Sequence, residues 1–297
     1  MKKYYLSSNI LLFITAIIWG FAFVAQRVGI QYMGTFTFNG IRFALGSLSL
    51  IPLILFLHFK IKNKNSEKTT PSKRTELLLA GIFVGLCLFF AATLQQIGLI
   101  ETTAGKAAFI TGLYIVLVPI FGIFLKHKFG IFTWIGAIIA VLGLYFLSVN
   151  ERFSISRGDL YELAGAVLWS VHILLIDHFS RKVDVLKLAC LQFFVCSALS
   201  IITALFVEKI AIESIYQARI PLLYGGLCSV GIAYTLQIVG QKNANPSHAA
   251  IILSLETVFA ALGGFVLLNE RLNSMGVVGC ILMFSGMILS QIQNFRR

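Results

Sequence analysis

The chain has 297 residues, of which 58% are hydrophobic and 12% charged, and its mean hydropathy is +0.89. This composition excludes a soluble protein, which needs a polar surface. The net charge of +12 does not indicate a nucleic-acid partner, because in a multi-span membrane protein basic residues gather in the cytoplasmic loops. We therefore expect an integral membrane protein with lipid, not nucleic acid, around it.

Apolar runs long enough to cross a bilayer follow one another along nearly the whole chain. A span needs ~20 mostly apolar residues to cross ~30 Å of hydrocarbon. In chain order the predicted spans are 9–29, 36–58, 77–98, 104–125, 131–149, 160–178, 186–207, 220–240, 247–268 and 275–293. The sequence thus predicts an all-α integral membrane protein with ten transmembrane helices.

The distribution of Lys and Arg predicts the orientation. With the N-terminus in the cytoplasm, sixteen of the 24 basic residues fall in cytoplasmic segments, including the loop KIKNKNSEKTTPSKR at 60–74. Basic residues favour the cytoplasmic side, so both termini are predicted there. The five cysteines fall inside spans without a C-x-x-C pattern, which predicts free thiols, no metal site and no cofactor.

Two stretches of the chain are similar to each other. Residues 92–114, ATLQQIGLIETTAGKAAFITGLY, and residues 234–256, YTLQIVGQKNANPSHAAIILSLE, share eight of 23 positions at an offset of 142. Near this offset, other residues of the first half correspond to residues of the second: Trp19 to Trp169, Arg42 to Gln192, Gly136 to Gly279 and Gly143 to Gly286.

Each half therefore holds five spans, residues 1–150 and residues 151–297. Because five is odd, the second half must enter the membrane from the side opposite to the first. An inverted repeat of this kind allows two similar conformations, one open to each side of the membrane. The sequence thus predicts a 5+5 inverted repeat and transport by alternating access.

Several motifs resemble the EamA-type transporters of the drug/metabolite transporter superfamily. They are IIWG followed by Arg27, then Arg42, Pro119, and LETVFAALGGFVLLNERLNSMGVVGCILMFSG at 255–286. The resemblance covers essentially the whole chain. It implies a ten-helix bundle that exports small metabolites or amino acids, usually without ATP, with the fifth helix of each half at the periphery or at a dimer contact.

Ionisable residues inside spans are candidate functional residues, because they cost at least ~2.5 kcal/mol to insert. Glu256 lies near the middle of the ninth span and would either couple transport to protons, bind a cation, or hold helix ends together. Arg42 would bind a substrate carboxylate or anchor helices. His172 would relay protons or simply pack.

Polar and aromatic residues at mid-depth are further candidates for a cavity wall. Trp19 and Trp169 lie away from the interfacial belts where Trp usually gathers. Lipid offers no partner to amides and hydroxyls, so most such groups should point into the protein. These are Gln95, Gln237, Tyr234 and Tyr114, the last being the repeat mate of Glu256. Pro119 and the pair Gly263 and Gly264 are the expected sites of helix interruption.

Other classes of protein fit less well. The segment TTAGKAA lacks both the Gly five residues before Gly105 and the Ser or Thr after Lys106 that a phosphate-binding loop needs, which argues against ATP. A membrane enzyme acting on lipid usually gathers carboxylates or histidines around Mg²⁺, and the three aspartates lie at or beyond span ends. A binding or sensor protein remains an alternative, but the sequence shows no soluble module that could transmit a signal.

The sequence therefore predicts a multi-pass secondary transporter of the cytoplasmic membrane, a monomer or homodimer, and not an enzyme. Its substrate would be a small metabolite, such as an amino acid, bound in a cavity formed by the first four helices of each half. Import and export both remain open, as do proton coupling and uncoupled facilitation.

Overall fold

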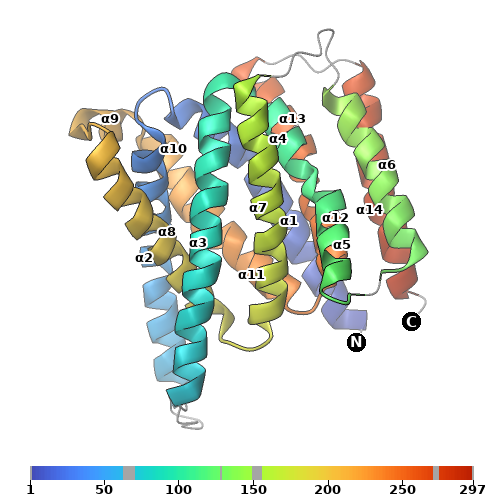
Figure 1. The fold of residues 1–297 in the computed structure, drawn as a ribbon, viewed down its shortest axis with the longest axis horizontal. Coiled ribbons are helices and arrows are strands. Elements are labelled where there is room, and N and C mark those ends of the chain that lie inside the picture. The colour runs from blue at the N-terminus through green and yellow to red at the C-terminus, as the bar shows by residue number, and fades with distance from the viewer. Residues whose placement is uncertain (1, 63–70, 128, 149–155, 270–273, 296–297) are drawn as a thin grey trace.

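The computed structural model describes residues 2–62, 71–127, 129–148, 156–269 and 274–295, and every element in these ranges is a helix (Figure 1). The first half contributes α1 (Lys2–Gly29), α2 (Thr35–Lys62), α3 (Pro71–Glu101), α4 (Ala104–Gly112), α5 (Tyr114–Phe124) and α6 (Ile131–Ser148). The second half contributes α7 (Arg157–Ser180), α8 (Val185–Val207), α9 (Ile212–Gln217), α10 (Arg219–Leu223), η1 (Tyr224–Tyr234), α11 (Thr235–Gln241), α12 (Pro246–Leu253), α13 (Glu256–Leu268) and α14 (Ser274–Phe295). Within these ranges the predicted all-α class is confirmed.

Among the described residues, eight helical segments are long and apolar enough to cross a membrane. They are Ser7–Gly29, Thr35–Lys60, Arg74–Glu101, Ala104–Phe124, Arg157–Ser180, Val185–Val207, Arg219–Gln241 and Pro246–Leu268. Two shorter apolar stretches, Ile131–Phe146 and Ser274–Ser290, lie in α6 and α14. Large apolar side chains such as Phe56, Phe206 and Val266 point outward, as a lipid-facing surface requires.

Two predicted spans, 104–125 and 247–268, are each built from two helices instead of one. The first is divided between α4 and α5, and the second between α12 and α13. At the breaks the backbone torsions of Leu113 (φ −60°, ψ −13°) and Leu255 (φ −62°, ψ −13°) are nearly the same. The amide of each leucine donates to the residue three positions earlier, at 3.1 and 3.2 Å, which is the pattern of a 3₁₀ turn.

The interruptions do not occur at the residues expected from the sequence. Pro119 lies inside α5, where it removes one backbone hydrogen bond without ending the helix, and Gly263 and Gly264 lie inside α13. Gly263 instead permits close packing, because a Cβ there would lie 3.0 Å from a methyl group of Val24 in α1. The tight turns next to Leu113 and Leu255 divide the spans instead.

The eighth predicted span, 220–240, also departs from a regular α-helix. Its middle is η1, an 11-residue π-helix between α10 and α11. Long π-helical stretches are rare, and π-helical turns often occur at functional sites. Two glycines let η1 approach α2: a Cβ on Gly226 would lie 2.6 Å from Leu45 Cβ, and Gly46 faces the side chain of Val230.

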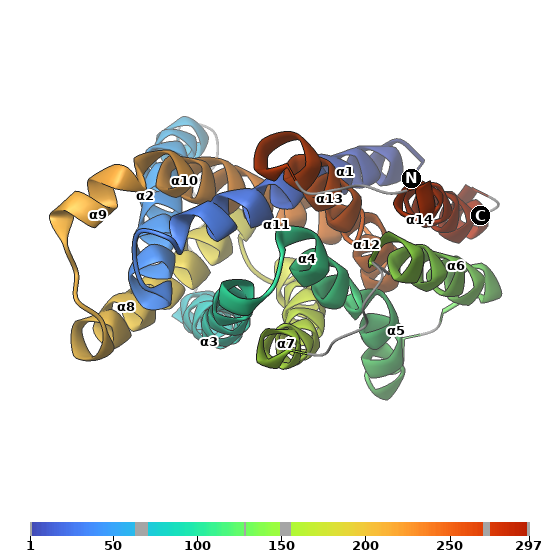
Figure 2. The ribbon, with the colours of Figure 1, turned by 90° about the horizontal axis from the view of Figure 1, so that it is seen from above.

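Helices α6 and α14 stand side by side at one edge of the molecule (Figures 1 and 2). A Cβ on Gly136 would lie 2.7 Å from the carbonyl oxygen of Gly286, and a Cβ on Gly143 would lie 2.7 Å from that of Gly279. Small residues allow this close approach of two backbones. The peripheral pair thus uses its glycine faces within the chain, which leaves these faces unavailable to a second copy.

Candidate functional site

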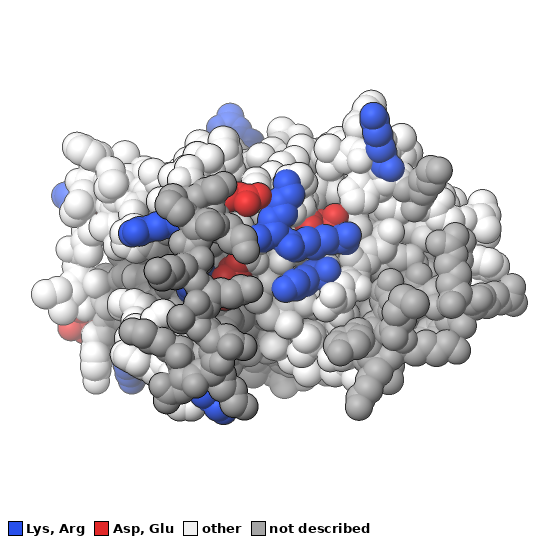
Figure 3. Space-filling model, turned by 90° about the horizontal axis from the view of Figure 1, so that it is seen from below, with Lys and Arg blue, Asp and Glu red and all other residues white. Residues whose placement is uncertain are grey.

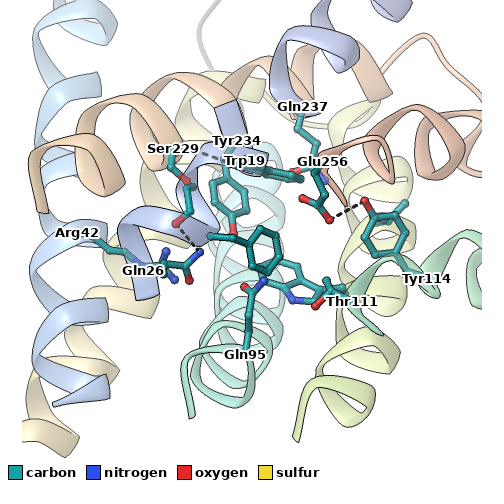
Figure 4. A pocket seen from close by; sticks show the side chains of 14 residues that line it. Trp19, Gln26, Arg42, Gln95, Thr111, Tyr114, Ser229, Tyr234, Gln237 and Glu256 are labelled. Carbon is teal, nitrogen blue, oxygen red and sulfur yellow. Dashed lines mark hydrogen bonds between the residues drawn. The ribbon is translucent and has the colours of Figure 1, made fainter. Parts of the chain in front are cut away.

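A small cavity lies in the interior between α1, α2, α3, α4, α5, α7, η1, α11 and α13 (Figure 4). Its lining residues are Trp19, Ala22, Phe23, Gln26, Arg42, Gln95, Thr111, Tyr114, Trp169, Ile173, Ser229, Tyr234, Gln237 and Glu256. The cavity has a volume of about 30 Å³. That is room for a water molecule or two, whereas pockets for metabolite-sized ligands measure hundreds of Å³. The cavity is therefore too small to hold a metabolite in this conformation.

Glu256 and Tyr114 meet at the point where the two divided spans face each other. The Tyr114 hydroxyl donates to Glu256 Oε1 at 2.9 Å, and both side chains are buried (Figure 4). Each is the first residue of the helix that follows a break, Tyr114 in α5 and Glu256 in α13. The 3₁₀ turns thus bring two repeat mates into direct contact at the cavity wall.

Arg42 is fully enclosed, with 2% of its surface exposed. Its Nε donates to Asn39 Oδ1 at 2.9 Å, and its guanidinium lies 4.9 Å from the ring centre of Phe43 and 5.6 Å from that of Phe38. Its Nη2 has no hydrogen-bond partner among the described residues. A buried cation without an acceptor for one of its donors suits an anionic group that enters the cavity.

Aromatic rings fill the space between these polar groups. The rings of Trp19 and Tyr234 lie 4.5 Å apart, and Trp169 lies 6.1 Å from Tyr234. The Trp19 indole donates to the carbonyl oxygen of Ser229 in η1 at 3.4 Å, which fixes this ring against the π-helix. In Figure 4 Arg42 lies to one side of the rings and Glu256 to the other.

Buried amides complete the wall. Gln95 and Gln237, which are repeat mates, both line the cavity, and Gln237 Oε1 has no hydrogen-bond partner within the described part of the chain. Gln26 and Ser229 also line it, although the sequence did not single them out. Both resemble ordinary polar residues of a helix, so no pattern distinguished them.

His172 is the one predicted site residue that does not line the cavity. Its Nε2 lies 3.0 Å from Gln192 Oε1, and its ring packs at 5.6 Å, edge to face, against Trp169. It is fully buried behind the aromatic wall. His172 therefore contacts the cavity only through its neighbours. Its hydrogen-bond partner, Gln192, is the repeat mate of Arg42.

One buried ionisable residue escaped the sequence analysis. Glu162 lies in the second turn of α7, is 0% exposed, and accepts a hydrogen bond of 3.1 Å from the cavity-lining Thr111. Its Oε1 has no hydrogen-bond partner among the residues that the structure describes. The rule that identified Glu256, an ionisable group inside a span, applies equally to Glu162 and would have found it.

Polar contacts hold both ends of the bundle together. At the end opposite the termini, Lys106 of α4 pairs with Asp159 of α7 at 2.7 Å. At the other end, Asp177 of α7 pairs with Arg181 at 2.6 Å and lies 3.8 Å from His127, which follows α5. Lys106 thus links α4 to α7 and His127 links the end of α5 to α7, whereas Asp177 and Arg181 are only four residues apart at the end of α7.

Comparison with known proteins identifies the class to which this fold and cavity belong. The EamA-like transporter family matches residues 6–149 and again residues 156–291. The chain therefore belongs to the EamA-like transporter family, and hence to the drug/metabolite transporter superfamily.

Its relatives carry transporter names. An uncharacterized transporter of Archaeoglobus fulgidus is 31% identical over 282 residues, 94% of this chain and 84% of its own length. The uncharacterized transporter YoaV of Bacillus subtilis is 23% identical over 95% of each chain. A solved crystal structure covers 98% of this chain and 98% of its own, with a TM-score of 0.77 and 18% identity, which shows a shared fold. The protein is thus a multi-pass membrane protein of a transporter family.

Proposed function

We propose that the protein is a secondary active transporter of the cytoplasmic membrane that moves small zwitterions, such as amino acids, by alternating access. The observation that carries this proposal is the small interior cavity with a buried arginine and a buried glutamate in its wall. Arg42 offers a free Nη2 donor to a carboxylate, and Glu256 offers an acceptor to an amine or a proton. The aromatic rings between them suit the apolar part of such a molecule.

The proposal includes a ten-helix architecture with two inverted halves, residues 1–150 and 151–297. Pairs of repeat mates that touch each other support it, because equivalent residues meet on a two-fold axis. Tyr114 bonds to its mate Glu256. The glycine contacts between α6 and α14 follow the same symmetry. Gly136 contacts Gly286, the repeat mate of Gly143, and Gly143 contacts Gly279, the repeat mate of Gly136.

The proposed orientation has both termini in the cytoplasm. Both termini lie at the same end of the molecule (Figure 1), and Lys and Arg side chains gather on that face (Figure 3). The turns that follow α5, α7 and α11 at this end carry Lys126, Arg181, Lys182 and Lys242. This asymmetry agrees with the preference of basic loops for the cytoplasmic side.

In the proposed cycle the substrate and a proton compete for the cavity. A proton on Glu256 removes the charge that would attract an amine, and its departure restores that charge. Opening of the contacts at one end or the other then exposes the cavity to each side of the membrane in turn. The tight turns at Leu113 and Leu255 are suited to this motion, since they already interrupt two spans next to the site.

The test is transport by the purified chain in liposomes loaded with a pH-sensitive dye. Amino acids, nucleosides, sugars and organic cations are added in turn to wild type, to Glu256→Gln and to the control Glu213→Gln, whose carboxyl is exposed in α9. We expect an amino acid to drive a pH change in wild type and in the control, and the Glu256 variant to lose it. Flux without a pH change, equal in all three proteins, would identify an uncoupled facilitator instead.

A further inference from the structure

We infer that Glu162 is a second proton-binding carboxyl of the transporter, which links the cavity to the end of the bundle opposite the termini. The inference rests on the proposed function, because it assigns a route to the protons that Glu256 would exchange. It starts from a buried carboxyl that the described fold leaves half unpartnered.

On the cavity side, Glu162 is connected through Thr111. The Thr111 hydroxyl donates to Glu162 Oε2 at 3.1 Å and also lines the cavity that holds Glu256 and Tyr114. The remaining oxygen, Oε1, packs against Gly98 of α3. A hydroxyl that contacts both the cavity and a buried acid can pass a proton between them.

On the other side, Glu162 is one helical turn from the surface. Asp159, three residues earlier in α7, pairs with Lys106, whose side chain is 37% exposed. Glu101 of α3 accepts from the backbone amide of Gly158 at the same end. The titratable or charged groups that face the carboxyl from the elements around it are thus Asp159, Glu101, Lys106, Tyr114 and Glu256.

No cation among the described residues pairs with Glu162 itself. An ionised carboxylate buried without a counter-charge costs several kcal/mol, whereas the neutral acid needs only a hydrogen bond. Lys106 reaches Asp159 and stops one turn short of Glu162. The surroundings therefore favour an acid that carries a proton while the cavity is closed.

The internal repeat provides a control, because the residue that corresponds to Glu162 lies in the first half of the chain. At the offset of 150 that relates Trp19 to Trp169, Glu162 corresponds to Leu12. Leu12 packs against Gly240, the repeat mate of Gly98, where a Cβ would lie 3.0 Å from its Cγ. The same corner of the fold is therefore filled by a leucine in one half and by a glutamate in the other.

Thr111, the hydrogen-bond partner of Glu162, also has an apolar repeat mate. Thr111 corresponds to Leu253 at the offset of 142, and Leu12 and Leu253 belong to one apolar cluster. The fold thus accepts an apolar pair at this position. A hydrogen-bonded acid and hydroxyl are not required for packing, which points to a chemical role for Glu162.

The proton movement balances without any further reactant. The O–H bond of Glu162 breaks and an O–H bond to the Glu256 carboxylate forms, with the Thr111 hydroxyl or a cavity water passing the proton. Glu162 is left as a carboxylate and takes a proton from water at the surface near Asp159. In the reverse direction the same groups release a proton to that side.

Two measurements on the full chain in liposomes test this. Infrared spectroscopy reports the absorption of neutral carboxyl groups in wild type, Glu162→Gln and the exposed control Glu213→Gln. Uptake of a radiolabelled amino-acid mixture is then compared with and without a pH gradient. We expect Glu162→Gln to lose part of the neutral-carboxyl absorption and to slow gradient-driven uptake at least about tenfold, with exchange of amino acids at equal pH close to wild type.

Each of the other possible results contradicts either this inference or the proposed role of Glu256. An unchanged neutral-carboxyl absorption, or a normal gradient-driven uptake, in Glu162→Gln refutes the inference and leaves the role of Glu256 standing. Absence of gradient-driven uptake in wild type refutes proton coupling at Glu256, and this inference with it.

Where Glu162→Gln does not fold, two other variants decide. Glu162→Leu copies Leu12 and Thr111→Val removes the linking hydroxyl, and both should fold and slow gradient-driven uptake. Normal gradient-driven uptake in either refutes the inference, and so does failure of both to fold, since the carboxyl would then be needed for packing.

Discussion

Replacement of Arg42 by Gln tests whether this buried cation binds substrate or holds the helices together. The structure gives Arg42 one hydrogen bond, to Asn39, two contacts with aromatic rings, and one unpartnered nitrogen. A hydrogen bond to a charged group contributes about 1.5–3 kcal/mol, and a desolvated cation–π contact about 2 kcal/mol. Burial of the charge costs several kcal/mol in the opposite direction.

The two contributions nearly cancel, so the variant should change the free energy of unfolding by no more than about 2 kcal/mol. For a chain of 297 residues, with an unfolding entropy of ~2.1 cal/mol/K per residue, that corresponds to a shift in melting temperature of roughly 3 °C. Transport should change much more. Loss of one charge-assisted hydrogen bond from Nη2 to a carboxylate, about 1.5–3 kcal/mol, weakens binding roughly tenfold to a hundredfold.

The assay compares amino acids with the amines that lack only the carboxyl group, using wild type, Arg42→Gln and Arg42→Lys. Arg42→Gln should slow the amino acids and leave the amines nearly unchanged. Arg42→Lys keeps the charge but loses the planar fork, so an intermediate rate is expected. Equal losses for acids and amines, together with a melting temperature lowered by much more than about 3 °C, would assign Arg42 to the scaffold.

Three further predictions concern packing and topology. Gly286→Val places a Cβ 2.6 Å from a carbonyl oxygen of α6, so thermal unfolding should show a loss of about 1–3 kcal/mol, while the lipid-facing Val277→Ala should not. Gly98→Ala places a Cβ 2.6 Å from an oxygen of the buried Glu162, so it should slow gradient-driven uptake and lower the free energy of unfolding by about 1–3 kcal/mol; normal uptake would contradict this. A reporter at Arg297 should be labelled only from the cytoplasmic side, and external labelling would invert the topology.

The sequence predicted the helices well because lipid imposes a simple length and polarity on each span. It did not predict the breaks at Leu113 and Leu255. Neither residue has the properties of proline or glycine, and a 3₁₀ turn differs from an α-helical turn by only roughly 10–30° in ψ and one residue of hydrogen-bond register. The π-helix η1 was hidden for the same reason, since its sequence is that of an ordinary apolar span.

The sequence predicted those cavity residues that are unusual inside a membrane span, and it did not predict the ordinary ones. Trp19, Trp169, Arg42 and Glu256 are conspicuous at mid-depth, and all four line the cavity. Glu162 lies at the very start of the predicted span 160–178, where burial depends on how the neighbouring helices pack and not on depth in the membrane. Position along a span could not show which face His172 presents, which depends on how α7 packs against α8.

A repeated scaffold explains why the chemistry appears in unlike pairs. Two copies of the same fold would place identical side chains on both sides of the cavity, and identical charges there would repel each other. The amides Gln95 and Gln237 are identical mates, but Glu256, Arg42 and Glu162 each have a mate of different character, namely Tyr114, Gln192 and Leu12. The mates preserve the packing while only one member carries a charge. It follows that exchange of the residues of one such pair, Tyr114→Glu with Glu256→Tyr, should retain the fold and move the acid across the proposed two-fold axis. If the fold is symmetric at this point, proton coupling should survive the exchange far better than it survives Glu256→Gln, and a melting temperature and dye-loaded liposomes would show whether it does.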